Sequence, residues 1–424
     1  MLPLEPGQEG VIVQAGGERL VLPAGVPGDR VRVVRGAATL LAPSPARVTA
    51  PCPLLERCGG CSLQAMDYRA QLAQKTDALR RALAGLGLTP NKVQEVVGLE
   101  RPFGQRTKLL MAAGGRAGVL RLGFYRRGTT ELVPAEGCPV QHPRSLALLA
   151  SARQLLDAYH VKPSGSREGG WLHALGVRVD PRSGESELAL SGTSPRVPAD
   201  LVQQLVRLPS VSGVHLAVSR TRTSYPMEGP LRTLAGRPRT AFTLGDERHL
   251  LSPGTFFQTC AEGAERLLET VRGLLPGRVD LLADLYAGAG LLALGCRGRW
   301  RRAVTVEANP AAVADLRRRL EREGSGGLSV LAGRVEDRIG EVLRRGPDVA
   351  LLDPPRRGCG PRVMAALCAH GPPVVLYVAC GFEALLSDSR TLLGGGYRLN
   401  AAAAVDMFPH TPHLESVVRF ERES

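Results

Sequence analysis

The clearest indication of fold class in this chain is the run Val279-Asp-Leu-Leu-Ala-Asp-Leu-Tyr286-Ala-Gly-Ala-Gly290. Its apolar first half predicts a buried strand over 279–286, and Gly288 and Gly290 predict a tight turn into a helix. A second strand, 303–306, is followed by Glu307, placed where an acid would accept a ribose hydroxyl group. The pattern predicts a site for an adenosine-containing cofactor. It fits NAD nearly as well as S-adenosylmethionine, and an ordinary β–α turn is the simplest alternative.

Three more reactive side chains follow strand-like runs in the same part of the chain. Asp353 opens Asp-Pro-Pro after the apolar run 349–352, a combination typical of methyltransferases that act on bases and unexpected in dehydrogenases. Cys380 ends the strand 374–379 and precedes a helical segment, where a thiol is partly ionised and nucleophilic. Glu415 opens a final apolar strand and is a candidate general base. Taken singly, each residue has a competing interpretation: a helix cap for Asp353, a structural thiol for Cys380 and an exposed strand residue for Glu415.

Four cysteines form the sharpest local feature elsewhere. Cys52, Cys58 and Cys61 lie in Cys-x5-Cys-Gly-Gly-Cys, and Cys138 precedes a proline. Four thiolates suit an iron–sulfur cluster or a tetrahedral zinc ion, and the spacing favours iron–sulfur over zinc. Buried thiols without a ligand are the alternative. Nine cysteines without an export signal argue against a disulfide framework.

The fold class expected from these patterns is α/β, with four segments. Short strands and turns over residues 1–48 predict a small OB-like β-barrel of the kind that binds oligonucleotides. Residues 49–91 hold the cysteine loop and a helix, and 92–245 read as an irregular β-rich central domain. Alternating strands and helices over 246–424 predict a doubly wound, mostly parallel, Rossmann-like sheet.

Charge and hydropathy restrict the partners. Of 424 residues, 54 are Lys or Arg and 40 are Asp or Glu, and the net charge of +14 favours a polyanion such as RNA. The first ten residues lack the apolar core of a secretory signal, and the apolar runs are too short to cross a membrane. We expect a cytoplasmic protein with no membrane association.

Together these motifs resemble the bacterial S-adenosylmethionine-dependent RNA uracil-C5 methyltransferases, which make 5-methyluridine. The resemblance covers nearly the whole chain. It includes Leu122-Gly-Phe-Tyr-Arg-Arg-Gly128 and Ser252-Pro-Gly-Thr-Phe-Phe-Gln258, besides the cysteines and the strand ends already described. The chain departs from the family pattern at four places: Leu291, Cys260, Arg334 and Gly381-Phe382.

The resemblance implies a role for each motif. It implies an N-terminal TRAM domain and a [4Fe-4S] cluster held by Cys52, Cys58, Cys61 and Cys138. For catalysis it implies Cys380 as nucleophile toward uracil C6 and Glu415 as base. The implied S-adenosylmethionine pocket contains Gln258, Tyr286, Gly288, Gly290, Glu307 and Asp353.

Large-subunit (23S) rRNA is the preferred substrate by analogy, and tRNA is the alternative. A monomer suffices, because one chain carries a complete set of site residues, and no obligate protein partner is expected. An NAD-linked iron–sulfur oxidoreductase, an RNA cytosine-C5 methyltransferase and an RNA-binding homologue with a decayed pocket are the competing functions.

Overall fold

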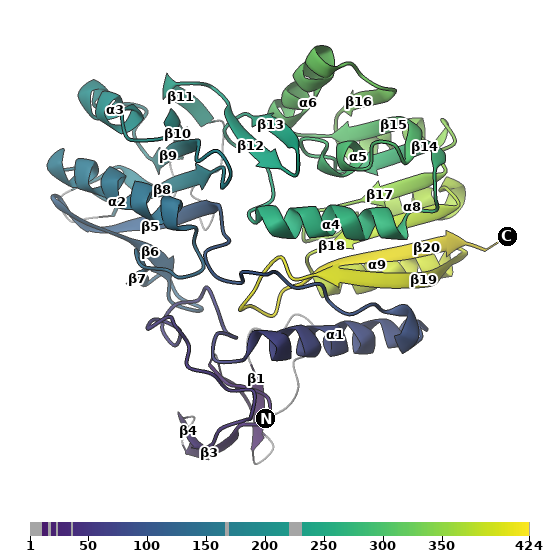
Figure 1. The fold of residues 1–424 in the computed structure, drawn as a ribbon, viewed down its shortest axis with the longest axis horizontal. Helices are drawn as coiled ribbons and strands as arrows, with labels where there is room; N and C mark the ends of the chain where they lie inside the picture. Colours follow the sequence, from purple (N-terminus) through teal and green to yellow (C-terminus); the bar gives the residue numbers. More distant parts are fainter. Residues whose placement is uncertain are drawn as a thin grey trace. The chain divides into compact units, whose positions relative to one another are not determined.

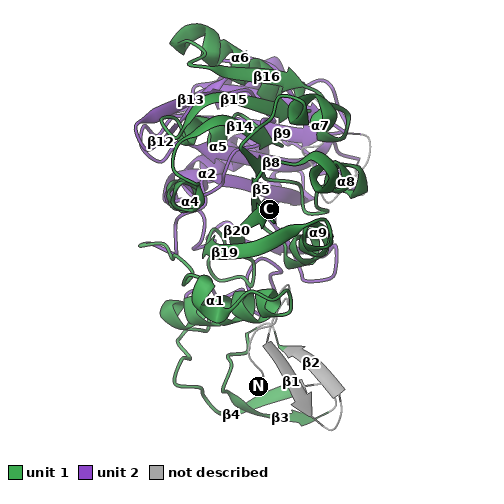
Figure 2. Ribbon diagram, turned by 90° about the vertical axis from the view of Figure 1, so that its right-hand side faces the viewer, with its two compact units in different colours: residues 1–50, 62–100, 263–424 green, residues 51–61, 101–262 purple. Residues whose placement is uncertain are grey.

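The computed structural model describes residues 11–15, 18–22, 24–34, 37–165, 169–219 and 231–423. The chain divides into two compact units, coloured separately in Figure 2. Unit 1 comprises residues 1–50, 62–100 and 263–424, and unit 2 comprises residues 51–61 and 101–262. Both units therefore combine segments that are distant in sequence. The four contiguous segments expected from the sequence stay predictions.

Unit 1 is built on a seven-stranded sheet with the order β16-β15-β14-β17-β18-β20-β19 (Figure 1). Its strands are β14 (Val279–Leu285), β15 (Trp300–Glu307), β16 (Leu328–Ala332), β17 (Val349–Leu352), β18 (Val374–Ala379), β19 (Tyr397–Val405) and β20 (Glu415–Arg422). Strands β14 to β18 pair in parallel, and β20 runs antiparallel to both β18 and β19. The doubly wound, mostly parallel sheet predicted from the alternating pattern is confirmed.

Helices cover both faces of this sheet, as its continuously apolar strands require. They are α1 (Tyr68–Ala84), α4 (Ala261–Leu274), α5 (Leu291–Gly295), α6 (Pro310–Glu323), α7 (Val335–Leu343), α8 (Pro361–His370) and α9 (Phe382–Gly394). One buried cluster joins side chains of α1, α7, α8 and α9 to the central strands. Figure 2 shows α4 across the sheet from α8 and α9.

Residues 62–100, which include helix α1, are part of unit 1. Helix α1 contributes Leu79 and Leu83 to the main core. A short 3₁₀ helix, η1 (Pro90–Lys92), then leads into residues 93–97, which pair in parallel with the edge strand β19. The amide of Val97 donates to the carbonyl of Ala404 at 2.9 Å. This pairing satisfies backbone groups that an open sheet edge would leave exposed.

The N-terminal strands form two separate hairpins. Strand β1 (Val11–Ala15) pairs with β2 (Glu18–Leu22), and β3 (Arg30–Val34) pairs with β4 (Ala37–Ala42). Within the described ranges no hydrogen-bonded strand pair links one hairpin to the other. Their strand character agrees with the sequence, whereas the closed barrel and its TRAM identity stay predictions.

Unit 2 has a second seven-stranded sheet, with the order β11-β10-β9-β8-β5-β6-β7. The strands are β5 (Lys108–Arg116), β6 (Val119–Tyr125), β7 (Leu132–Pro134), β8 (Leu172–Val179), β9 (Ser186–Gly192), β10 (Val211–Val218) and β11 (Leu231–Gly236). Its core cluster includes side chains of α2 (Pro143–Ala158) and α3 (Ala199–Val206). A separate hairpin joins β12 (Thr240–Leu244) to β13 (Glu247–Leu251). The β-rich character expected of this region is present.

Among the residues that the structure describes, no helix combines the length and apolar character that crossing a bilayer requires.

Candidate active site

Four strand ends of unit 1 meet at one edge of the sheet. Parallel strands β14, β17 and β18 end at this edge and lead into Tyr286, Asp353 and Cys380, respectively. Strand β20 is antiparallel, so its first residue, Glu415, lies at the same edge. The register pairs Ala379 with Ser416, and this brings the Cys380 and Glu415 positions together. The sheet thus gathers a thiol and two carboxyl groups at the edge where open α/β sheets bind ligands.

The glycine turn after β14 is held by Glu307. One carboxylate oxygen of Glu307 accepts from the amide of Gly288 at 2.7 Å, and the other accepts from the amide of Asn309 at 2.6 Å. Gly290 has a φ of +79°, and a Cβ there would lie 2.9 Å from a Leu316 methyl group. The positive φ strongly favours glycine at this position, and the close approach of Leu316 adds to that preference. The turn places backbone amides and an acid together, as an adenosine cofactor needs.

Asp284 is a site residue that the sequence reasoning missed. It is fully buried in β14, and one carboxyl oxygen accepts from the Ala293 amide at 3.0 Å. Burial, helped by the nearby Asp353 and Glu307 charges, raises the pKa of Asp284 to about 7. The available signal was an acidic residue within the apolar run 281–285, because such a group needs a partner or a proton when it is buried.

The two predicted catalytic side chains lie in a common electrostatic environment. Burial raises the pKa of Cys380, and the Glu415 and Asp353 charges raise it further. Burial and the Asp353 charge raise the pKa of Glu415 well above its ordinary value, and burial raises that of Asp353 to about 7. A carboxyl with a pKa of about 7, such as Asp353, can exchange protons at physiological pH, and the raised pKa of Glu415 makes its carboxylate a stronger base. The edge therefore places a thiol beside two carboxyl groups with raised pKa values.

Arg356 supplies the positive charge at this edge and was also missed. It lies in the loop after Asp353, and its guanidinium lowers the pKa of both Cys380 and Glu415. This opposes the effect of burial and favours the thiolate. The run Asp353-Pro-Pro-Arg-Arg was visible in the sequence, but it did not indicate which arginine faces the thiol.

A buried network supports the same loop. The Asp388 carboxylate accepts from the Tyr377 hydroxyl at 2.6 Å and from the Cys359 amide at 2.8 Å. The Tyr286 hydroxyl donates to the Cys359 carbonyl at 3.2 Å. Tyr286 has a φ of +66°, a conformation that residues other than glycine seldom adopt. These bonds connect the strand ends of β14 and β17 through helix α9 and strand β18.

Gln258 belongs to unit 2. Its segment is held by Arg178, whose guanidinium donates to the carbonyls of Thr255 and Ser252 at 3.2 and 3.4 Å and stacks over Phe242. Arg178 also lines a cavity of about 310 Å³ in this unit, together with Lys108, Glu187 and Thr255. The role of Gln258 in a cofactor pocket stays a prediction.

The predicted cluster cysteines all lie in unit 2. Burial raises the pKa of Cys58 and Cys138, and charge on Cys52 acts on both in the same direction, so these three thiols are electrostatic neighbours. The Gly60 amide donates to the Cys58 sulfur at 3.4 Å, and the Arg127 guanidinium donates to the Cys61 carbonyl at 3.0 Å. Thiols are suitable donors for a cluster. However, within the described ranges no three His, Cys, Asp or Glu side chains are arranged to hold a metal ion.

The whole chain is similar to proteins named RNA methyltransferases. It is 33% identical to an uncharacterized RNA methyltransferase of Gloeobacter violaceus over 99% of this chain and 95% of that protein. It is 32% identical to another from Thermosynechococcus vestitus, over 92% of this chain and 90% of that one. No protein-family model matches the chain.

One solved structure covers the whole fold. The tRNA (uracil-54, C5)-methyltransferase of Pyrococcus abyssi, solved with S-adenosyl-L-homocysteine, has a TM-score of 0.77 and 25% sequence identity. The match spans 99% of both chains.

Proposed function

This chain belongs to the S-adenosylmethionine-dependent RNA methyltransferases, and on that premise we propose that it methylates C5 of a uridine in RNA. The observation that carries the proposal is the meeting of Cys380, Glu415 and Asp353 at one sheet edge. A methyltransferase acting on an amine nitrogen needs no thiol there, because the amine is already nucleophilic. Uracil C5 is not, and it needs activation by addition at C6.

The proposed reaction uses Cys380 as a covalent nucleophile. The thiolate adds to C6, and the electron pair of the C5–C6 double bond moves toward C5. That electron pair then forms the bond from C5 to the methyl group, which bound S-adenosylmethionine would supply from its sulfonium sulfur as the S–CH3 bond breaks, with S-adenosylhomocysteine as the product. Glu415 then removes the C5 proton, the double bond re-forms, and the sulfur of Cys380 leaves C6. Because C5 and C6 are stacked in a duplex, the target uridine would be unpaired or flipped out.

The cofactor would lie over the glycine turn. We assign the ribose hydroxyls to Glu307, and the backbone around Gly288 and Gly290 would face the methionine part of the cofactor. Tyr286 and Asp353 would border the transferred methyl group, and Gln258 would contact the cofactor from its own segment. The Glu307 hydrogen bonds to the turn support this assignment, since they fix the acid beside the glycine amides.

Two RNA classes are candidate substrates. We propose 23S rRNA as the preferred target because the four cysteines and the strand-rich N-terminus resemble the ribosomal branch of the family. The solved relative is a tRNA uracil-54 methyltransferase, and this favours tRNA as the second candidate. The two substrates require the same chemistry at C5.

The test is methylation of unmodified total RNA with labelled S-adenosylmethionine, followed by separation of the RNA by size and identification of the labelled nucleoside. We expect 5-methyluridine from the wild-type protein and none from Cys380→Ala. Glu415→Gln is expected to accumulate a covalent protein–RNA adduct that survives denaturing electrophoresis. Cys368→Ala, which removes a thiol from α8 outside the site, serves as the control. Cofactor binding without label in any RNA would argue against the proposed substrate, and absence of binding would favour a decayed pocket.

The remaining family features are also proposals. We propose that Cys52, Cys58, Cys61 and Cys138 bind a [4Fe-4S] cluster, supported by the mutual electrostatic influence of three of them. We assign no reaction step to it. Iron and sulfide analysis of anaerobically purified protein, compared with Cys58→Ala, tests the cluster. RNA binding by a protein lacking residues 1–48 tests the TRAM assignment, and sedimentation tests the monomer.

A further inference from the structure

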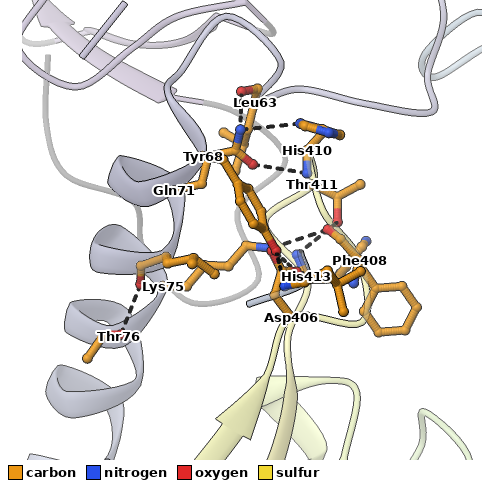
Figure 3. A network of polar contacts seen from close by, with 12 residues as sticks. Leu63, Tyr68, Gln71, Lys75, Thr76, Asp406, Phe408, His410, Thr411 and His413 are labelled. Atoms are coloured by element: carbon orange, nitrogen blue, oxygen red, sulfur yellow. Dashed lines mark hydrogen bonds and ion pairs between the residues drawn. The ribbon is translucent and has the colours of Figure 1, made fainter. Parts of the chain in front are cut away.

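The loop that ends at Glu415 is unusually buried. Residues 406–414 connect β19 to β20, and Asp406, Met407, His410 and Leu414 are each at most 2% exposed. Loops usually run over the surface, because their backbone groups need hydrogen-bond partners. Here the partners come from helix α1 and the residues just before it, as Figure 3 shows. The loop and its partners lie more than 300 residues apart in sequence.

A buried ion pair fixes the first turn of this loop. The ammonium group of Lys75 donates to Asp406 Oδ1 at 2.6 Å and to the Phe408 carbonyl at 3.2 Å. The two side chains are 2% and 0% exposed. Asp406 Oδ1 also accepts from the Phe408 amide at 3.1 Å. Since each charge is buried, each depends on the other, and removal of one alone leaves an uncompensated charge.

A second set of hydrogen bonds fixes the middle of the loop. Gln71, one turn before Lys75 on α1, accepts from the His410 amide at 3.0 Å through its side-chain oxygen. Its amide nitrogen donates to the Leu63 and Met66 carbonyls at 3.0 and 2.8 Å. The amides of Ser62 and Leu63 donate to the His410 carbonyl at 3.0 and 2.9 Å.

The backbone conformation of His410 also indicates that this loop is held by contacts from outside it. Its φ of +67° lies in the left-handed region, which residues with a side chain seldom adopt without external support. The bonds from Gln71, Ser62 and Leu63 supply that support on both sides of the residue. The backbone is therefore fixed five positions before Glu415.

The contacts of Lys75 and Gln71 hold the loop between β19 and β20, the strand pair that carries the proposed base, Glu415. Val405 and Glu415 are register partners in β19 and β20, so the loop starts and ends at the same point of the sheet. Lys75 fixes Asp406 beside this point. We propose that helix α1 is the positioning element for Glu415, with Lys75 and Gln71 as positioning residues that hold its carboxyl toward Cys380. This inference depends on the proposed role of Glu415 as the base.

A positioning role predicts a specific kinetic defect. If the loop shifts, Cys380 can still add to C6 and the methyl group can still transfer, but removal of the C5 proton slows. A misplacement of about 1 Å can cost about 100-fold in rate. We therefore expect the covalent protein–RNA adduct to accumulate and turnover to fall by about 10- to 100-fold. KM for RNA should fall together with kcat, because the adduct accumulates before the slowed step, so kcat/KM should change little.

The test uses Lys75→Met combined with Asp406→Leu, since removing both charges avoids a lone buried ion that could prevent folding. Gln71→Met is the second variant. Leu83→Ala is the control, because it weakens the packing of the same helix in the main core without removing a bond to the loop. Wild-type protein and Glu415→Gln are assayed alongside for 5-methyluridine and for adduct on denaturing gels.

Adduct accumulation in the double variant and in Gln71→Met, but not in Leu83→Ala, would support the proposal. Wild-type turnover without adduct in the double variant would overturn it. A parallel loss of adduct and product would also overturn it, because that result indicates a purely structural role. If wild-type protein makes 5-methyluridine but Glu415→Gln traps no adduct, the assignment of the base fails and the positioning role fails with it. Absence of 5-methyluridine from the wild-type reaction would overturn the proposed function itself.

Discussion

The effect of replacing Asp284 by asparagine on the stability of unit 1 should be more favourable at high pH than at low pH. The side chain is fully buried in β14, and its Oδ1 atom has no hydrogen-bond partner. Oδ2 accepts from the Ala293 amide, a bond that an asparagine carbonyl can keep. Burial raises the pKa of this carboxyl from 3.8 to about 7. The folded protein therefore holds a proton that the unfolded chain releases.

The sign and size of this pH dependence follow from the difference in bound protons between the folded and the unfolded state. Between pH 3.8 and 7 the folded state binds the proton and the unfolded state does not, so stability falls by about 1.4 kcal/mol per pH unit. Above pH 7 the wild-type protein has lost about 4 kcal/mol of stability in this way, and at pH 5 it has lost about 1.6 kcal/mol. An asparagine NH2 left without an acceptor in place of Oδ1 would cost about 1–3 kcal/mol at every pH. The gain from the substitution should therefore be about 3 kcal/mol larger at pH 8 than at pH 5.

The two tryptophans of the chain provide the assay. Trp171 lies in unit 2 and Trp300 is buried in β15, beside β14. In a Trp171→Phe background, Trp300 fluorescence reports urea unfolding of unit 1 at pH 5 and pH 8.

The matched control is Asp280→Asn on the same strand. Asp280 is exposed, and hydrogen bonds from Arg301 and Arg302 lower its pKa to about 2. Its contribution is constant between pH 5 and pH 8, so the control should show no pH-dependent difference. The reasoning is wrong if the gain from Asp284→Asn does not grow between these two pH values.

Two further predictions concern the loop and the nucleophile. Gly358→Ala should destabilise the protein by about 2 kcal/mol and weaken S-adenosylmethionine binding. The reason is that Gly358 has a φ of +82° and that a Cβ there would lie 2.7 Å from the Asp388 carboxylate. An unchanged melting temperature and an unchanged cofactor affinity in titration calorimetry would contradict this prediction. The rate at which Cys380 forms the RNA adduct should rise with pH through neutrality and above, since burial raises the pKa of the thiol and leaves it protonated at pH 7. Rapid-mixing experiments across that pH range measure the rate, and a flat or falling profile would show that thiolate formation does not limit addition.

Much of the site could be predicted because it depends on local patterns. The strand expected over 279–286 is β14, and the strand expected over 374–379 coincides with β18. Parallel strands present their carboxyl ends at one edge, so residues after these strands were expected to meet there. The order of alternating elements was enough to indicate the sheet, and the strand ends identified Asp353 and Cys380 as candidates.

Other features depend on contacts that no local pattern encodes. Sequence periodicity marks Asp284 only as an exception in an apolar strand, whereas its raised pKa comes from burial and from Asp353 and Glu307. Arg356 and Arg357 are adjacent in sequence, yet only Arg356 acts on the thiol. Loop residues such as these take their direction from the packing around them.

Local sequence patterns were enough to predict the fold class, the glycine turn and the strand-end residues, because hydrophobic periodicity and glycine conformation act within a few residues. Which buried charges lie next to one another depends instead on long-range packing. That packing placed Lys75 against Asp406 across 331 positions of sequence and joined helix α1 to the loop before Glu415. Such pairings depend on how distant segments fold against each other, since a buried charge is stable only where the fold supplies its counterpart.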